Sequence, residues 1–178
     1  MVAQERNVRI ADVTVTVEEG LRYRLGEISF KGGTVFPADE MRRMFPMQAG
    51  EVFNTEKMRE GIQNLRKLYG TQGYINLTPV PVSTSDDSRQ TVDVIFDLDE
   101  GKLFSFGPLV LDGPEPHAGA RKALLESWKK LQGKPFDWDA LQQWLRKNRL
   151  KWPSAAPTPV ETSQDQTSQV VTVRLSFP

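Results

Sequence analysis

The residues with the clearest chemical potential are carboxylates gathered between residues 83 and 116. This stretch holds eight acidic residues against two basic ones, Arg89 and Lys102, for a net charge of −6. Paired carboxylates can act as general acid and general base when they face each other in a cleft. Here Asp93, Asp97 and Asp99 alternate with apolar residues, so we expect them to project from the outer face of a strand. A solvated surface is therefore a simpler interpretation than a catalytic site.

The residues that other kinds of catalytic or metal site need are missing from the sequence. The chain has no cysteine, which excludes disulfides, cysteine-based zinc sites and cysteine nucleophiles. His117 is the only histidine and lies in a turn-like stretch, GPEPHAGA, and no G-x-S-x-G motif is present. Gly32 and Gly33 follow a predicted strand, but no glycine-rich phosphate loop with its lysine occurs. We predict no catalytic residues, no metal site and no cofactor. An enzyme remains the alternative from another class, which a fixed concave site with a perturbed carboxylate would favour.

A basic, tryptophan-rich region covers residues 118–151. It holds nine Lys or Arg residues against three acids, a net charge of +6, and all four tryptophans lie in or beside it: Trp128, Trp138, Trp144 and Trp152. Such a region can bind nucleic acid or lipid headgroups. Amphipathic helices with basic outer faces and buried tryptophans are the simpler interpretation. The whole chain has 23 basic and 23 acidic residues, so a nucleic-acid partner is not expected.

Length and composition leave room for one or two small domains. The chain has 178 residues, of which 38% are hydrophobic. No apolar run approaches the length of a membrane-spanning helix. The first ten residues contain no signal-peptide core. We therefore expect either a cytosolic protein or a part of a longer chain whose targeting segment is missing.

The elements that position these residues follow from an internal repeat. Four pairs of blocks recur in the same order at a spacing of about 80 residues: GEISFKG with GPLVLDG, GEVFNTEKM with GKPFDWDAL, TPVPV with APTPV, and DVIFDLDEG with VTVRLSFP. DVTVTVEEG at 12–20 matches DVIFDLDEG as a partial third copy. We therefore assign residues 1–20 to the last strand of a preceding, truncated unit, and residues 21–101 and 102–178 to two complete units. The orphan strand at about 8–18 is expected to pack irregularly or to pair with another molecule.

Each unit has the element order β-α-α-β-β. In the first unit Pro37 can open a short helix, and Asn54 caps a second helix whose apolar residues recur on one face until Gly70. In the second unit a helix covers 120–131 and Asp137 caps the next. Polar hairpin loops are expected at 83–90 and 161–169. The predicted class is α+β, with each unit a three-stranded sheet covered by two helices.

The opening strand of each unit changes phase at a glycine. Apolar residues on either side of Gly26, and likewise of Gly107, have opposite parity, which predicts a bulge or kink. We infer that the earlier half of each strand packs against the preceding unit. Phe104 and Phe106 would then lie at the junction between the two complete units.

Two prolines predict which strand forms the sheet edge. Pro79 and Pro81 lie two residues apart in the second strand of the first unit, and Pro157 and Pro159 hold the same places in the second. Proline has no N–H, so both missing donors must face outward on an edge strand. An added strand would be only half bonded there, which protects against uncontrolled pairing.

The sequence resembles a tandem of POTRA domains of the Omp85 family. The resemblance lies in YRLGEISFKGGTVFPADEM, in GEVFNTEKMREGIQNLRKLYGTQGY and in VDVIFDLDEG, where a strand ends in Glu-Gly and runs into the next unit. It is weaker for 102–178, whose second helix is shorter and lacks the YGTQGY block. The family implies β-α-α-β-β modules that stand in the periplasm before an outer-membrane barrel. There they receive outer-membrane or secreted polypeptides and dock accessory lipoproteins.

We therefore predict a periplasmic, non-enzymatic module that captures client strands at a sheet edge or an adjacent groove. The expected contact residues are Tyr74, Asn76, Thr78 and Val80. Contact with the membrane would occur only through a barrel that lies outside this chain, and strand-mediated self-association is a further expectation. The alternative within the same fold is a scaffold that docks one defined partner, of the two-partner-secretion or cell-division type.

Overall fold

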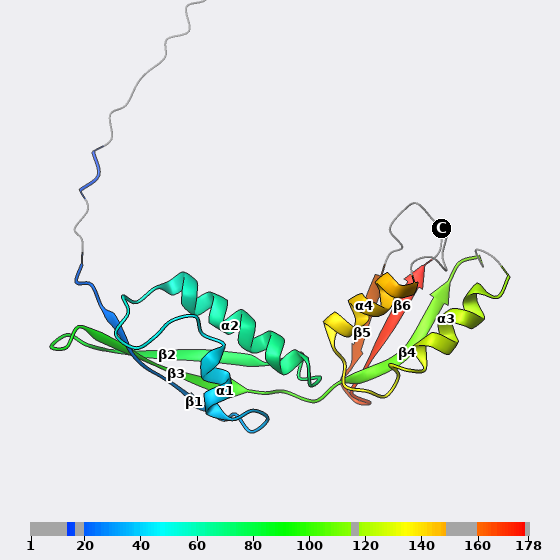
Figure 1. The fold of residues 1–178 in the computed structure, drawn as a ribbon, viewed down its shortest axis with the longest axis horizontal. Helices are drawn as coiled ribbons and strands as arrows, with labels where there is room; N and C mark the ends of the chain where they lie inside the picture. Colours follow the sequence, from blue (N-terminus) through cyan, green and yellow to red (C-terminus); the bar gives the residue numbers. More distant parts are fainter. Residues whose placement is uncertain (1–13, 17–19, 115–117, 149–159, 177–178) are drawn as a thin grey trace, which may run out of the picture.

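Two small α+β units follow one another end to end along the long axis of the molecule (Figure 1). The structure is a computed structural model and describes residues 14–16, 20–114, 118–148 and 160–176. The first unit contains β1 (Arg24–Lys31), α1 (Ala38–Arg43), α2 (Thr55–Gly70), β2 (Thr78–Asp86) and β3 (Thr91–Asp99). The second contains β4 (Ser105–Asp112), α3 (Ala120–Trp128), α4 (Trp138–Asn148), β5 (Val160–Asp165) and β6 (Val170–Ser176). The predicted element order is confirmed in both units.

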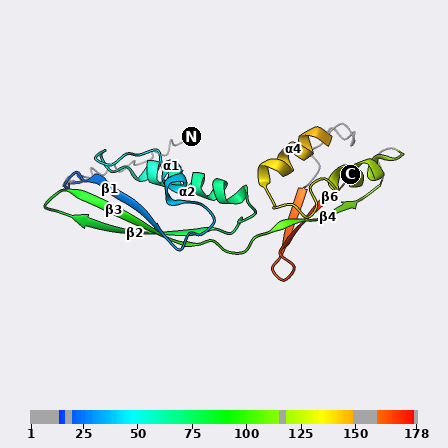
Figure 2. The same cartoon turned by 60° about the horizontal axis from the view of Figure 1, so that its bottom comes forward.

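Both sheets have the same topology. The strand order is β1-β3-β2 in the first sheet and β4-β6-β5 in the second. The outer strands β1 and β4 run parallel to the central strand, whereas β2 and β5 are antiparallel to it. In each unit both helices cover the same face of the sheet (Figure 2). Consequently β2 is an edge strand, as the prolines predict.

Helix α2 forms where its cap and its apolar face predict it. The Asn54 side chain accepts hydrogen bonds from the backbone N–H groups of Glu56 and Lys57, at 2.9 and 3.1 Å. The buried residues of the helix lie three to four positions apart and face the sheet: Met58, Gly61, Leu65 and Tyr69. Gly61 permits close packing, because a Cβ atom there would lie 2.1 Å from the Phe45 ring.

Each unit has its own apolar core. Phe45 and Phe96 pack together in the first core, with ring centroids 4.9 Å apart. Trp128 is the largest buried side chain of the second core and meets Phe106 edge-on at 5.5 Å. Its indole N–H donates to the carbonyl of Gly107 at 2.9 Å, so the one polar atom of this ring is satisfied.

The predicted phase changes are present, but their consequence differs from the prediction. The strand register shifts between Leu25 and Ile28 in β1, and between Phe106 and Leu109 in β4. The bulge absorbs the extra residue, so apolar side chains on both sides of it point into the same core. Phe104 and Phe106 accordingly lie in the core of the second unit, with exposed fractions of 0% and 2%. Ile75 of the first unit packs against this same core, so the role of the two side chains at the junction stays a prediction.

The first bulge explains one of the acidic residues. The Asp93 carboxylate accepts a hydrogen bond from the backbone N–H of Glu27 at 2.7 Å. A Cβ atom on Gly26 would lie 2.0 Å from the same carboxylate oxygen. Glycine at 26 thus makes room for the acid that satisfies the backbone at the bulge.

The hairpin loops are shorter than predicted. β2 continues to Asp86 and β5 to Asp165, because edge strands exposed to solvent tolerate the Ser, Thr and Asp residues that suggested loops. Each strand ends in an acid that accepts N–H groups of the turn, Ser88 for Asp86 and Thr167 for Asp165. Hydrogen bonds from Ser88 and from Ser168 lower the pKa of Asp86 and of Asp165, respectively.

Three predictions fall largely outside the described residues. The strand expected at 8–18 is described only at 14–16, where the chain is exposed and forms no strand. His117, Pro157 and Pro159 are not among the described residues. Among those described, no helix combines the length and apolar character needed to cross a bilayer.

Candidate partner-binding surfaces and the junction of the units

The free edge of β2 lies beside an apolar groove on the helical face of the first sheet. The groove has a volume of about 340 Å³. Its walls come from α2 and the segment before it on one side and from β2 and β3 on the other: Phe53, Met58, Ile62, Pro81, Val94 and Phe96. Unpaired backbone groups and apolar side-chain space are therefore adjacent, which is the arrangement that strand addition requires.

The prolines divide this edge into two parts. Backbone groups two residues apart on a strand point to the same side, so Ser83 and Ser85 share the outward direction of Pro79 and Pro81. The serines carry N–H groups, whereas the prolines do not. The part of β2 that can both donate to and accept from a new strand is thus its second half, where Ser83 also lines the groove.

The four predicted contact residues occupy different surroundings. Tyr74 is half-buried against the first core and meets Tyr69 edge-on at 6.3 Å. Asn76 donates from its side-chain amide to Gln164 Oε1 of the second unit at 3.0 Å. Thr78 and Val80 lie on the exposed strand, and the Val80 side chain is 52% exposed on the sheet face away from the helices. The structure thus leaves Thr78 and Val80 accessible, while Tyr74 and Asn76 make contacts within the chain.

The junction is built by the turn after α2. The Phe104 N–H donates to the carbonyl of Gly73 at 2.9 Å, and Ile75 packs against the core of the second unit. Gly73 has a φ of +84°, and a Cβ atom there would lie 2.4 Å from the Phe104 carbonyl oxygen. Lys102 donates to the Gln166 carbonyl at 3.2 Å. Phe104 therefore contributes to the junction, but through its backbone.

Sequence reasoning missed Gly73 and Ile75 as junction residues. Both belong to the segment around the YGTQGY block, which occurs in the first unit and not in the second. A block present in one copy of a repeat and absent from the other indicates a role outside the shared fold. That difference was the available signal, because the block contacts the neighbouring unit.

Glu100 fastens the end of β3 to the loop that follows β1. Its carboxylate accepts the backbone N–H groups of Thr34 and Val35 at 2.8 and 3.0 Å, and the Thr34 hydroxyl at 2.5 Å. It also accepts the hydroxyl of Tyr69, at 2.8 Å, from the end of α2. One side chain therefore joins a strand end, a loop and a helix, which gives the Glu-Gly of the repeat a structural role.

These hydrogen bonds set the ionisation of the cluster. Burial alone would raise the pKa of Glu100, but the hydrogen bonds donated by Thr34, Val35 and Tyr69 outweigh it and lower the pKa. Burial, together with the hydrogen bond to the Glu100 carboxylate, raises the pKa of Tyr69. Glu100 is thus held as the charged acceptor and Tyr69 as the neutral donor.

Other described acids of the 83–116 stretch have local partners on the surface. Asp97 pairs with Lys31 at 3.3 Å, with both side chains more than half exposed. Asp99 accepts the N–H of Gly101 at 3.0 Å. Across the part of the chain that the structure describes, no three His, Asp or Glu side chains gather as metal ligands would. The carboxylates therefore stabilise turns and strand ends.

The basic, tryptophan-rich region divides into buried and exposed parts. Trp128 and Trp144 pack edge-on at 4.9 Å within the second core, as the simpler interpretation predicts. Trp138 differs, because its side chain is 46% exposed at the start of α4. It leans edge-on against Phe136 at 4.9 Å and presents its outer side to the junction.

Comparison with known proteins agrees with this architecture. The POTRA family model, described as a surface antigen variable number repeat, matches residues 23–101. The outer membrane protein assembly factor BamA of Neisseria meningitidis serogroup B is 25% identical over 144 residues, covering 74% of this chain and 17% of BamA. A putative outer membrane protein assembly factor of Treponema pallidum is 29% identical over 65 residues, 36% of this chain and 8% of that protein. The chain thus spans less than a fifth of the length of either relative.

Solved structures show the same fold in tandem. POTRA domains 3–5 of BamA from Haemophilus influenzae superpose with a TM-score of 0.64 at 16% identity, over 89% of this chain and 62% of theirs. The first two POTRA domains of Omp85 from Anabaena give a TM-score of 0.59 at 17% identity, over 89% of this chain and 97% of theirs. At these identities the likeness concerns the fold.

The two units therefore define the class of protein: tandem modules of a three-stranded sheet and two helices, joined end to end. Residues 23–101, the first unit, match the POTRA family model, and the tandem fold of the two units is that of the POTRA domains in these solved structures. The Anabaena POTRA domains belong to the periplasmic domain of Omp85.

Proposed function

We propose that this chain is part of the periplasmic portion of an outer-membrane protein and serves as a scaffold of an assembly or secretion machine. Within that role it captures extended segments of client polypeptides along β2. The supporting observation is the free β2 edge, which runs beside the apolar groove formed with α2. Accessory lipoproteins would also dock on an exposed strand edge with an adjacent apolar groove.

The capture site is centred on the second half of β2. An added strand there can exchange backbone hydrogen bonds with Ser83 and Ser85, and its inward side chains can enter the groove next to Met58 and Ile62. Thr78 and Val80 extend the surface toward the start of the strand, where the prolines allow only half of the ladder. Backbone pairing with shallow side-chain contacts gives weak binding that tolerates many sequences, which suits transient handover.

Nuclear magnetic resonance with a synthetic peptide tests this proposal. The probe is a peptide of alternating valine and threonine, added to isotopically labelled protein. We expect shifts at the amides of Ser83 and Ser85 and at the methyl groups of Met58 and Ile62. The same peptide methylated at alternate backbone nitrogens should not bind, because it cannot form a ladder.

A matched pair of variants controls for the surface change. Ile62→Gln should weaken binding of the alternating peptide about fivefold, since it places a polar group in the groove. Leu125→Gln alters an exposed leucine on α3 and should leave binding unchanged. Shifts confined to other surfaces, or equal binding of the methylated peptide, would refute capture at β2.

A further inference from the structure

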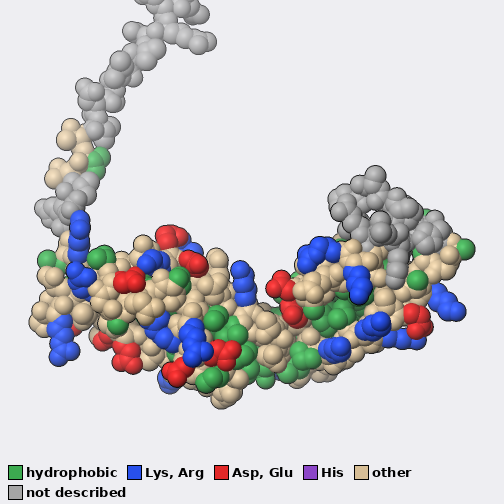
Figure 3. All heavy atoms as spheres, viewed as in Figure 1, with side chains coloured by type: hydrophobic (Ala, Val, Ile, Leu, Met, Phe, Trp, Pro, Cys, Tyr) green, Lys and Arg blue, Asp and Glu red, His purple; other side chains and the backbone are tan. Residues whose placement is uncertain are grey.

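A second and larger groove lies at the junction of the two units. It has a volume of about 780 Å³ and runs from α1 over the C-terminal half of α2 to the start of α4. Figure 3 shows the hollow between the units, with basic side chains on the rim of the first unit and acidic ones on the rim of the second. This groove is separate from the β2 edge, so a ligand bound in it does not depend on the proposed strand capture.

The first unit gives the groove a cationic wall. Arg43, Arg66 and Lys67 line it, and all three are exposed. None of them makes an ion pair or a side-chain hydrogen bond with another described residue. In the same part of the molecule most other charged side chains make an ion pair or a hydrogen bond, for example Lys57 with Glu51 at 2.8 Å. The wall from the first unit therefore carries positive charge that no described side chain pairs with directly.

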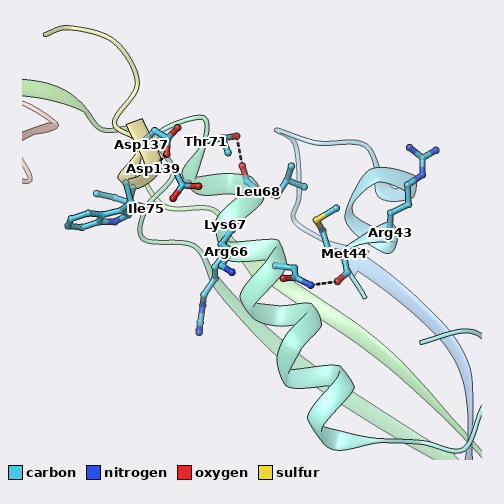
Figure 4. A pocket seen from close by; sticks show the side chains of 12 residues that line it. Arg43, Met44, Arg66, Lys67, Leu68, Thr71, Ile75, Asp137 and Asp139 are labelled. Carbon is cyan, nitrogen blue, oxygen red and sulfur yellow. Dashed lines mark hydrogen bonds between the residues drawn. The ribbon is translucent and has the colours of Figure 1, made fainter. Parts of the chain in front are cut away.

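The floor and the far end are of different character. Met44, Leu68 and Ile75 provide half-buried apolar surface along the floor. The exposed Trp138 lines the groove at the start of α4. Asp137 and Asp139 lie at the same end (Figure 4). Asp137 accepts the N–H of Asp139 at 2.8 Å and so is partly engaged in capping α4. The groove thus combines arginines that form no ion pair with described residues and an exposed tryptophan, residue types that are enriched in binding hot spots.

We propose that the junction groove binds a polypeptide segment that combines acidic residues with a large apolar side chain. The acidic residues would lie along Arg43 and Lys67, and the apolar side chain would pack on Ile75 and Trp138. Asp137 and Asp139 would repel acidic residues from the end of the groove at α4. The segment would therefore bind in one orientation only. This is recognition of side chains, in contrast to the backbone pairing along β2. A flat anionic membrane fits the site less well, because the apolar floor lies in a hollow between two units.

Fluorescence polarisation with labelled peptides tests the charge requirement. The probe carries three glutamates followed by phenylalanine and leucine, and its control carries lysines in place of the glutamates. We expect the acidic probe to bind about tenfold more tightly, with a difference that shrinks as salt is added. Arg43→Glu with Lys67→Glu should abolish this preference. Lys122→Glu with Lys130→Glu, on exposed positions of the second unit, should preserve it.

Trp138 provides an independent readout. Trp138→Ala should weaken the acidic probe about tenfold or more. In magnetic resonance spectra the Trp138 indole N–H signal should move on peptide addition, while the signal of the buried Trp128 stays in place. An N-methylated acidic probe should bind as well as the parent peptide, which separates this groove from the β2 edge.

Three outcomes would overturn the proposal. One is an unchanged affinity in Trp138→Ala. Another is an equal loss in both pairs of charge variants. The third is binding to vesicles of anionic phospholipid without binding to the peptide, which would assign the cationic wall to a membrane surface.

Discussion

The two units share a fold and differ in the contacts that join their elements. In the first unit the Glu100 carboxylate accepts hydrogen bonds from a loop and from Tyr69. In the second, the Trp128 indole N–H donates to the Gly107 carbonyl at the bulge, and its ring packs edge-on against Trp144. The two units therefore share strand order and bulge position, although different side chains join the elements of each.

The edges differ as well. β2 runs beside the apolar groove that it forms with α2, whereas the described residues of β5 are all exposed. An edge beside such a groove offers a client apolar surface in addition to backbone groups. We therefore expect client capture in the first unit and not in the second.

The largest loss of unfolding free energy is expected when Trp128, in the core of the second unit, is truncated. Trp128→Ala removes the biggest buried side chain of the second unit and should cost about 3–5 kcal/mol of its unfolding free energy. Residue-resolved hydrogen exchange should show the second unit opening while β1, β2 and β3 stay protected. Equal loss of protection in both units would mean that they fold as one cooperative body.

Gly73 tests whether the junction depends on a close backbone approach. Gly73→Ala and Gly133→Ala both place alanine at a positive φ, +84° and +80°, which costs roughly 1–2 kcal/mol in each case. Only at Gly73 would the new Cβ meet the Phe104 carbonyl, since nothing lies within 4 Å at Gly133. Small-angle scattering should show a changed inter-unit distance for Gly73→Ala alone. Identical scattering from the two variants would contradict the junction.

Glu100 tests the polar fastening of the first unit. Glu100→Gln should cost about 1–2 kcal/mol at neutral pH, because a weaker acceptor replaces a half-buried carboxylate. The pKa of Glu100 is lower in the folded state than in the unfolded chain, so its contribution is present above the unfolded value, about 4.3, and is lost as pH falls through the folded value. Denaturation at several pH values should show the wild type and the variant converging below about pH 4. A gap that stays constant into acid would contradict the role given to the carboxylate.

The prolines should give the smallest effect. Pro79→Thr with Pro81→Thr restores two outward N–H donors and should raise self-association through β2, with little change in fold. Sedimentation velocity measures this directly. An unchanged sedimentation coefficient over a range of concentrations would mean that the prolines only stiffen the strand.

Much of this structure could be predicted from the sequence, because repeats, caps and edge prolines are local signals. Asn54, Gly26 and Pro79 each reveal their role through their own type and their neighbours. The side of the sheet to which Phe106 points could not be predicted. The alternation of apolar residues does not say whether a bulge absorbs the extra residue and returns the later side chains to the same side. The partners of Glu100 and the contact of Ile75 with the second core depend on tertiary packing, across 66 residues in the case of Thr34. Local patterns carry no information on such contacts.

The central claim is that the first unit captures client strands along the second half of β2. Ser83 and Thr162 are equivalent positions on β2 and β5, paired with Val94 and Val173 of the central strands. Proline at either position removes one outward donor. The most direct measurement is the affinity of the alternating valine-threonine peptide for both variants. We predict that Ser83→Pro weakens binding about fivefold while Thr162→Pro leaves it unchanged. Equal effects, or a loss in Thr162→Pro alone, would contradict the account.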